Sequence, residues 1–177
     1  TGGIIESFVA ISSKIYTFTF TPDSDGSTYV GLAPSAFSDP AGNSNATSLD
    51  FHWTYDGTGP VMSISATNGK GESLQSGSAS NDELLLLTFS STEPTQDFTE
   101  ADLTLTNGSI SNFIKISSTV YIATFTPLSN GPTKIEIFGS TFFDAPGNAN
   151  IVGDPFEWHV DNGAPVIGQV NEGYGED

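Results

Sequence analysis

Hydrophobic and polar residues alternate along this chain in short stretches that are separated by turn-forming residues. Large apolar residues occupy every second position at Leu85, Leu87 and Phe89, and similar alternation recurs in residues 121–125 and 156–160. A period of two is typical of strands that bury one face, and the intervening Gly, Pro, Asn and Asp clusters mark turns. The pattern predicts strands at residues 61–66, 83–90, 102–106, 109–116, 119–126, 133–138 and 156–160.

The chain also repeats itself. Residues 1–62 match residues 106–167 without a gap, at an offset of 105. TGGIIESFVAISSKIYTFTFTP aligns with TNGSISNFIKISSTVYIATFTP, and FHWTYDGTGPV aligns with FEWHVDNGAPV. A fixed period of this kind is typical of repeat arrays. We therefore expect residues 1–60 to be the C-terminal part of one repeat, 61–165 a complete repeat, and 166–177 the start of a following repeat.

The strand count predicts the fold class. Seven short strands in about 100 residues favour an immunoglobulin-like sandwich, so we expect an all-β chain of tandem immunoglobulin-like β-sandwiches with about seven strands per 105-residue repeat. The N-terminal copy has no counterpart of residues 61–105, and half a sandwich exposes apolar surface and open strand edges. The missing strands come either from upstream in the same polypeptide or from another chain by strand addition.

Charge and composition narrow the function classes. The chain has four Lys, no Arg, 21 acidic residues and a formal net charge of −17, which argues against nucleic acid and against anionic membrane surfaces as partners. It has no Cys, so no disulfide framework is expected. No apolar run approaches the roughly 20 residues of a membrane helix, so we expect no membrane insertion.

Several motifs resemble a known family. They are STEP at residues 91–94, FTEADLTLTNG at 98–108, YIATFTP at 121–127, FFDAPGNAN at 142–150 and WHVD at 158–161. Their order is similar to that of bacterial-type Ig-like repeats in large surface adhesins and biofilm-associated proteins. The resemblance implies an extracellular, cell-surface spacer or adhesive module without catalysis. The out-of-phase ends add a second possibility, a filament or fibril whose copies, or adjacent repeats, associate head-to-tail.

Acidic residues are predicted to converge at the repeat junctions. In an Ig-like sandwich the B–C and F–G loops lie at one end, where the entering linker also arrives. Several oxygen ligands from three segments suit Ca²⁺. The alternative is turn chemistry, in which Asp and Asn side chains bind their own backbone. The candidate calcium ligands are Asp56, Glu93, Asp97, Asp102, Asp144, Asn148 and Asp161, the last serving the next repeat.

Two sequons make the chain a candidate glycoprotein. Asn45-Ala-Thr and Asn107-Gly-Ser are N-glycosylation acceptors in predicted loops, and glycans on adjacent cells or matrix are possible partners of an adhesin.

No catalytic constellation is evident, because His52 and His159 stand apart from each other and the chain has no Cys. We therefore expect no enzyme activity. The alternative function is a carbohydrate- or ligand-binding module appended to a secreted enzyme. An exposed aromatic cluster would favour it, and Phe142, Phe143 and Tyr174 are the candidates. Trp53 and Trp158 alternate with other apolar residues and are expected in the core.

Overall fold

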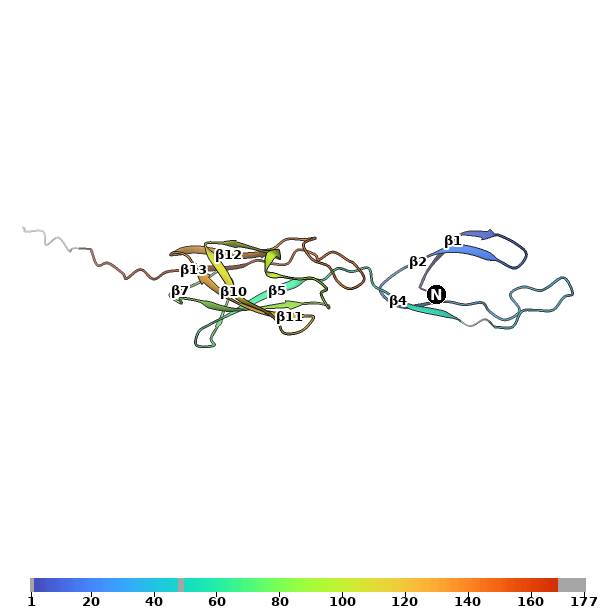
Figure 1. Ribbon diagram of the computed structural model, residues 1–177, viewed down its shortest axis with the longest axis horizontal. Helices are drawn as coiled ribbons and strands as arrows, with labels where there is room; N and C mark the ends of the chain where they lie inside the picture. Colours follow the sequence, from blue (N-terminus) through green and yellow to red (C-terminus); the bar gives the residue numbers. More distant parts are fainter. Residues whose placement is uncertain (1, 48–49, 169–177) are drawn as a thin grey trace, which may run out of the picture. The chain divides into compact units, whose positions relative to one another are not determined.

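The computed structural model describes residues 2–47 and 50–168, and it divides into two compact units. The boundary falls between Thr58 and Gly59. The part before it is called the N-terminal unit and the part after it the C-terminal unit. The described residues form strands and loops, with one short 3₁₀ turn at Glu100–Asp102. In Figure 1 the colours follow the chain, from blue in the N-terminal unit to red near the C-terminus.

The C-terminal unit is a sandwich of two sheets. One sheet has the order β10-β11-β8-β5-β6 and the other β7-β13-β12-β9. The central strands reproduce the ABED and CFG sheets of a constant-type immunoglobulin domain. The strands are β5 (Met62–Asn68), β6 (Ser73–Leu74), β7 (Ser78–Ser80), β8 (Leu85–Ser91), β9 (Leu103–Thr106), β10 (Gly108–Lys115), β11 (Val120–Pro127), β12 (Gly131–Ile137) and β13 (Phe156–Val160).

All seven strands expected in this unit form, and two short ones are added. β6 and β7 lie in the polar stretch between the first two predicted strands, which the pattern marks only as loop. β7 pairs in parallel with β13, and the indole of Trp158 donates a hydrogen bond of 3.0 Å to the Ser80 hydroxyl. The chain therefore crosses from one sheet to the other between β6 and β7, and pairing with strands distant in the sequence fixes this crossing.

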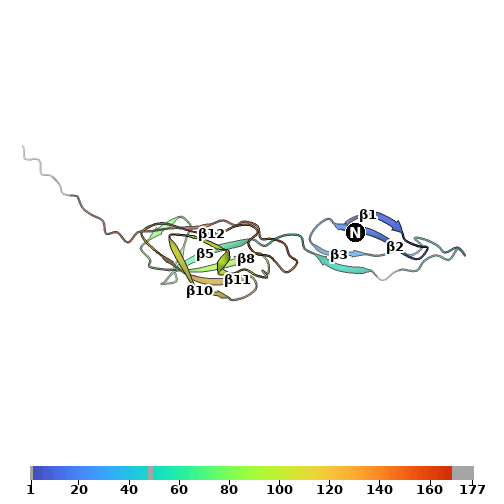
Figure 2. The same cartoon turned by 45° about the horizontal axis from the view of Figure 1, so that its top comes forward.

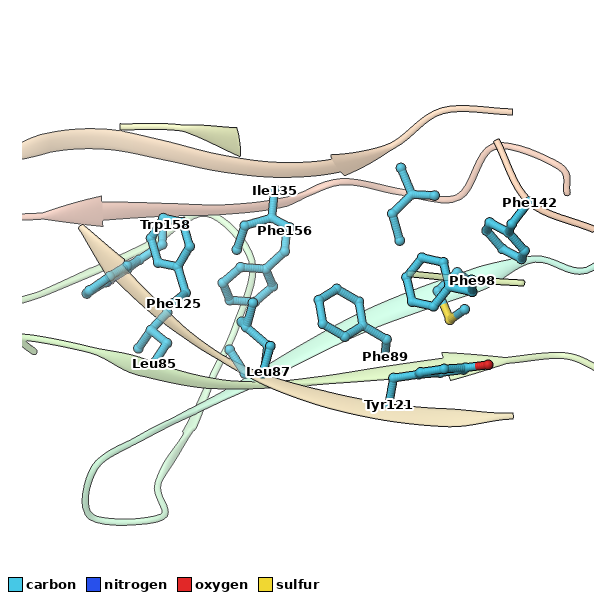
Figure 3. Close-up of a cluster of buried hydrophobic side chains, with 14 of the residues drawn as sticks. Leu85, Leu87, Phe89, Phe98, Tyr121, Phe125, Ile135, Phe142, Phe156 and Trp158 are labelled. Atoms are coloured by element: carbon cyan, nitrogen blue, oxygen red, sulfur yellow. The ribbon is translucent and has the colours of Figure 1, made fainter. Parts of the chain in front are cut away.

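The core lies between the two sheets. Figure 3 shows Leu85, Leu87 and Phe89 of β8 pointing toward Phe156 and Trp158 of β13. Phe98, from the loop after β8, packs against Tyr121 at 5.0 Å and Phe142 at 4.8 Å between ring centroids. The alternation in the sequence thus becomes the inner face of each sheet, as expected. The remaining members of the core are Met62, Ala66, Ala123, Phe125, Ile135, Ile137 and Val160.

The N-terminal unit consists of two hairpins that face each other (Figures 1 and 2). One is β1 (Gly3–Ala10) with β2 (Tyr16–Pro22), and the other is β3 (Gly26–Val30) with β4 (Phe51–Tyr55). Phe20 of β2 and Trp53 of β4 pack in a T-shaped arrangement with ring centroids 5.3 Å apart, a contact that joins the two strand pairs. These strands are the counterparts of β10, β11, β12 and β13.

The first hairpin repeats the details of its counterpart. In both, the register shifts after four paired residues: between Glu6 and Val9 in the N-terminal unit, and between Ser111 and Ile114 in the C-terminal unit. The bulge is accompanied by a left-handed residue, Ser7 or Asn112. A bulge at a fixed place in an edge strand is a structural device rather than an irregularity.

Candidate functional site: an acidic loop cluster

Pairing within the C-terminal unit brings three segments to one end of the sandwich. Met62 at the start of β5 pairs with Ser91 at the end of β8. Beyond these strands, isolated bridges join Thr95 to Asp144 and Val61 to Ile151. The loop after β8, the loop before β13 and the entry to β5 therefore meet, as the sandwich topology leads us to expect.

Asp144 organises the loop before β13. Its Oδ1 accepts hydrogen bonds from the backbone N–H groups of Gly147 at 2.7 Å and Asn148 at 2.6 Å. Its Oδ2 accepts a bond of 2.8 Å from the side-chain amide of Asn148. Burial of Asp144 raises its pKa, but the bonds from Asn148 and Gly147 together outweigh this effect and hold the pKa below its usual range. The carboxylate is therefore charged at neutral pH.

The corresponding loop of the N-terminal unit is held by the same kind of hydrogen bonds to an Asp carboxylate. Asp39, the counterpart of Asp144, accepts bonds from the backbone of Ala41 and Asn43, each at 2.9 Å, and from the Asn43 side chain at 2.9 Å. The Asn43 side chain is the largest cause that holds the Asp39 pKa below its ordinary value. Turn chemistry is thus one role of these residues in both units.

Two carboxylates from different loops of the C-terminal unit lie close together. Asp144 is buried and Glu93 is half-buried, and one carboxylate oxygen of each lies within 4.8 Å of the other. The candidate ligand Asp56 belongs to the N-terminal unit, just before the boundary. Glu93 and Asp144 thus offer carboxylate oxygens from two different loops. Hard divalent ions such as Ca²⁺ bind this kind of all-oxygen donor set.

The other predicted ligands lie elsewhere or serve the backbone. Oδ1 of Asp97 accepts a bond of 2.8 Å from the Phe143 N–H, which ties the two loops together. Oδ2 of Asp102 accepts bonds from the backbone and hydroxyl of Thr99 at the start of the 3₁₀ turn. Asp161 follows β13 and accepts a bond of 2.9 Å from its own turn, at Gly163. None of these three belongs to the group of clustered carboxylates found among the described residues, which includes Glu93 and Asp144.

Sequence reasoning missed the structural role of a paired asparagine. Oδ1 of buried Asn150 accepts bonds from Thr141 N at 2.8 Å and Phe142 N at 3.1 Å, while its Nδ2 donates to the Phe138 carbonyl at 2.8 Å. Its counterpart Asn45 makes two matching bonds, accepting from Phe37 N at 3.0 Å and donating to the Ala33 carbonyl at 2.8 Å. The repeat contains a signal for this role. Both copies have Asn at this position, but Asn150 is followed by Ile-Val and forms no sequon, so glycosylation does not explain why Asn occurs in both.

Both candidate glycosylation amides are engaged in hydrogen bonds. Nδ2 of Asn45 donates to the carbonyls of Ala33 and Ala46, each at 2.8 Å. Nδ2 of Asn107 donates to the carbonyls of Ser129 at 2.9 Å and Pro132 at 3.3 Å. A glycan replaces one of these N–H groups, so modification at either residue removes a bond of the folded loop.

The aromatic side chains singled out in the sequence differ in their exposure. Trp158 is buried, as expected. Phe142 is also buried, so the expectation that it joins an exposed aromatic cluster is wrong: it fills the core beside Phe98. Phe143 is exposed, and Tyr174 lies outside the described residues. His52 is exposed and stacks on Tyr29 at 5.3 Å.

The strand order and the two packed sheets define an immunoglobulin-like β-sandwich. The family model for the bacterial Ig-like domain matches residues 56–160, more than half of the chain. The chain therefore belongs to the bacterial Ig-like domain family, which confirms the resemblance drawn from its motifs. The matched segment contains the candidate ligands Asp56, Glu93 and Asp144.

Two further searches give no relative, because no curated protein and no solved structure matches the sequence. In the part of the chain that the structure describes, no helix has the length and apolar character needed to cross a bilayer.

Proposed function

We propose that this chain is part of an extracellular structural protein in which Ig-like repeats act as spacers of a cell-surface adhesin. The observation that carries the proposal is a recurrence at an offset of 105 residues: the same hairpin register, and the same loop held by an Asp carboxylate, at Asp39 and at Asp144. Bacterial Ig-like domains are structural modules rather than catalytic ones. Repeats of this kind gain stability from each unit and from its neighbours, which suits a protein whose work is to span distance.

Localisation is the direct test of this proposal. An antibody raised against the C-terminal unit should label intact source cells, and protease added outside the cells should remove the label. The net charge of −17 favours such a setting, since cations in the medium screen the self-repulsion of the chain. Labelling that appears only after the cells are permeabilised contradicts an adhesin or any other surface role.

We further propose that Glu93 and Asp144, together with Asp56 from the segment that enters the repeat, bind Ca²⁺. The carboxylates of Glu93 and Asp144, within 4.8 Å of each other, repel unless a cation or protons neutralise them. A bound calcium ion replaces that repulsion with attraction and links the segment that enters the repeat to two of its loops. In a tandem array such an ion stiffens the connection between repeats.

A calcium titration with matched variants tests the proposed site. Ca²⁺ should raise the melting temperature of the parent, and the double variant Asp56→Asn with Asp144→Asn should lose this response. The control is Asp39→Asn with Asp161→Asn, at the positions related by the offset of 105, which removes the same two charges and leaves an amide oxygen to accept the backbone bonds of each turn. The control should keep the response of the parent. Equal calcium responses in all three proteins would exclude Asp56 and Asp144 as calcium ligands.

A further inference from the structure

The sequence contains four Asn-Gly pairs, and such pairs are candidate sites of deamidation. In this reaction the backbone nitrogen of the second residue attacks the side-chain carbonyl of the Asn, and Gly permits the approach because it has no Cβ. The pairs begin at Asn68, Asn107, Asn130 and Asn162. The dipeptide is the same in all four, so their order of reactivity depends on how the fold holds each Asn side chain and each Gly nitrogen.

The fold restrains the Asn side chain in two of the pairs. Oδ1 of buried Asn68 accepts bonds of 3.0 Å from Lys70 N and Glu72 N, and its Nδ2 donates to the Glu72 carboxylate at 2.8 Å. Nδ2 of Asn107 donates to two carbonyls, and its Oδ1 accepts a bond of 2.8 Å from the Ser129 hydroxyl. Each side chain must break several bonds before it turns toward the Gly nitrogen, so both pairs are protected.

The third pair is restrained more weakly. Asn130 is exposed, but its Oδ1 accepts a bond of 3.2 Å from the backbone N–H of Asn162. Gly131 is the first residue of β12 and pairs with Val160 of β13. The attacking nitrogen of this pair therefore belongs to a paired strand, and we expect Asn130 to react more slowly than an Asn in an irregular segment.

The side chain of Asn162 is unrestrained. It is exposed in the segment that follows β13, and the described residues provide no hydrogen bond to it. Its counterpart Gly57 is exposed as well, although a folded unit follows it two residues later. The exposure therefore belongs to this position of the repeat.

A carboxylate faces the attacking nitrogen of this fourth pair. Gly163 N donates a bond of 2.9 Å to Oδ1 of Asp161. The nitrogen must lose its proton as it bonds to carbon, and a carboxylate at hydrogen-bond distance is placed to accept that proton. The fourth pair thus combines a mobile electrophile with an adjacent proton acceptor.

We propose that Asn162 is a site of spontaneous deamidation in the folded protein, assisted by the Asp161 carboxylate. Gly163 N forms a bond to Cγ of Asn162, the Cγ–Nδ2 bond breaks, and ammonia leaves with the proton that Asp161 accepted. The product is a cyclic imide. Water then adds to one of the two imide carbonyls, which gives isoaspartate or Asp in place of Asn. Water is the only co-reactant, and no group is oxidised or reduced.

The modification changes the segment that leaves β13. Both products add one negative charge beside Asp161, and like charges repel. Isoaspartate also adds one carbon to the main chain between Asn162 N and Gly163 N. These two N–H groups bond to Asn130 and to Asp161, so the added carbon changes their spacing and weakens the hold on the segment. The inference therefore assigns a slow and irreversible loosening to the exit of the repeat.

Peptide mapping of the folded chain after incubation in neutral buffer tests the proposal. Cleavage after Lys places each Asn-Gly pair in a separate peptide, and the cleavage points are Lys14, Lys70, Lys115 and Lys134. The peptide of residues 135–177 should be the first to show the mass change from amide to carboxylate, and its fragments should place the change at Asn162. An isoaspartyl methyltransferase should label the same peptide. In a control unfolded in urea, all four pairs should react.

Two variants test the chemistry. Gly163→Thr introduces the residue that stands at the equivalent position of the first copy, Thr58, and a β-branched side chain hinders the attack. The mass change at Asn162 should be lost. Asp161→Asn keeps an oxygen acceptor but removes the carboxylate, so it should slow the reaction without abolishing it. An unchanged rate in Asp161→Asn would overturn the assisting role of Asp161.

Two outcomes would overturn the proposal as a whole. One is a folded chain in which Asn68 or Asn107 reacts before Asn162. The other is a folded chain whose Asn162 stays unmodified for the time in which the unfolded chain reacts at all four pairs. The loosening has its own measurement, because the amides of Asn162 and Gly163 should exchange hydrogen faster after modification. Exchange at the rate of the unmodified chain would contradict it.

Discussion

Replacing Asn150 with Ala should destabilise the C-terminal unit strongly. The change removes the acceptor for Thr141 N and Phe142 N and the donor to the Phe138 carbonyl, all of which surround the buried Asn150 side chain. A buried polar group left without a partner costs about 1–3 kcal/mol. With one to two of these groups kept from water, the expected loss is about 2–4 kcal/mol, a fall in melting temperature of roughly 10–20 °C for a domain of about 100 residues.

Asn45→Ala is the matched control for this prediction. Asn45 makes the same bonds to Phe37 N and the Ala33 carbonyl, but it is only half-buried, so water replaces them. The expected change is under about 1 kcal/mol. Thermal unfolding followed by Trp158 emission in a Trp53→Phe background reports on the C-terminal unit alone. A fall of less than about 5 °C for Asn150→Ala, or an equal fall for both variants, would refute the reasoning.

Three further outcomes are expected of the C-terminal unit. Tyr121→Phe removes a buried hydroxyl 2.6 Å from the Thr95 hydroxyl, and urea unfolding should show a loss of about 1–2 kcal/mol; a parent-like midpoint contradicts this. Phe98→Ala should cost about 3–5 kcal/mol and should increase the binding of a hydrophobic dye. Because hydrogen bonds lower the pKa of Asp144, its stabilisation is present above the unfolded-state value of about 4 and is lost as pH falls through the folded pKa. Asp144→Asn should show a weaker loss on acidification.

The strands of the sandwich were predictable because each buries one face. The alternation of Leu85, Leu87 and Phe89 is enough to place β8 and to orient it. β7 was not predictable, since its Ser-Ala-Ser sequence has no apolar pattern and its pairing with β13 depends on the chain crossing between sheets.

The location of the candidate site was predictable from the sequence, but the set of residues that form it was not. Strand topology alone brings the two loops and the entering linker together, and Asp144 and Glu93 follow from it. Asp102 was misplaced because its carboxylate caps the 3₁₀ turn through Thr99, a local use that the spacing of acids does not reveal. Asp97 likewise binds a backbone N–H. Whether an acid serves the backbone or faces other acids depends on loop geometry, which charge counts do not determine.

The bulge shared by β1 and β10 has a consequence for how such a protein folds. Copies that resemble each other are held at high local concentration along one polypeptide, so a strand of one copy is always near the wrong neighbour. An open edge would accept that neighbour with little loss of side-chain fit. The left-handed residues Ser7 and Asn112 break the ladder of each edge after its fourth pair, and an interrupted edge is a poor template for further pairing. The bulge therefore disfavours pairing between strands of neighbouring copies, so that each copy can fold separately.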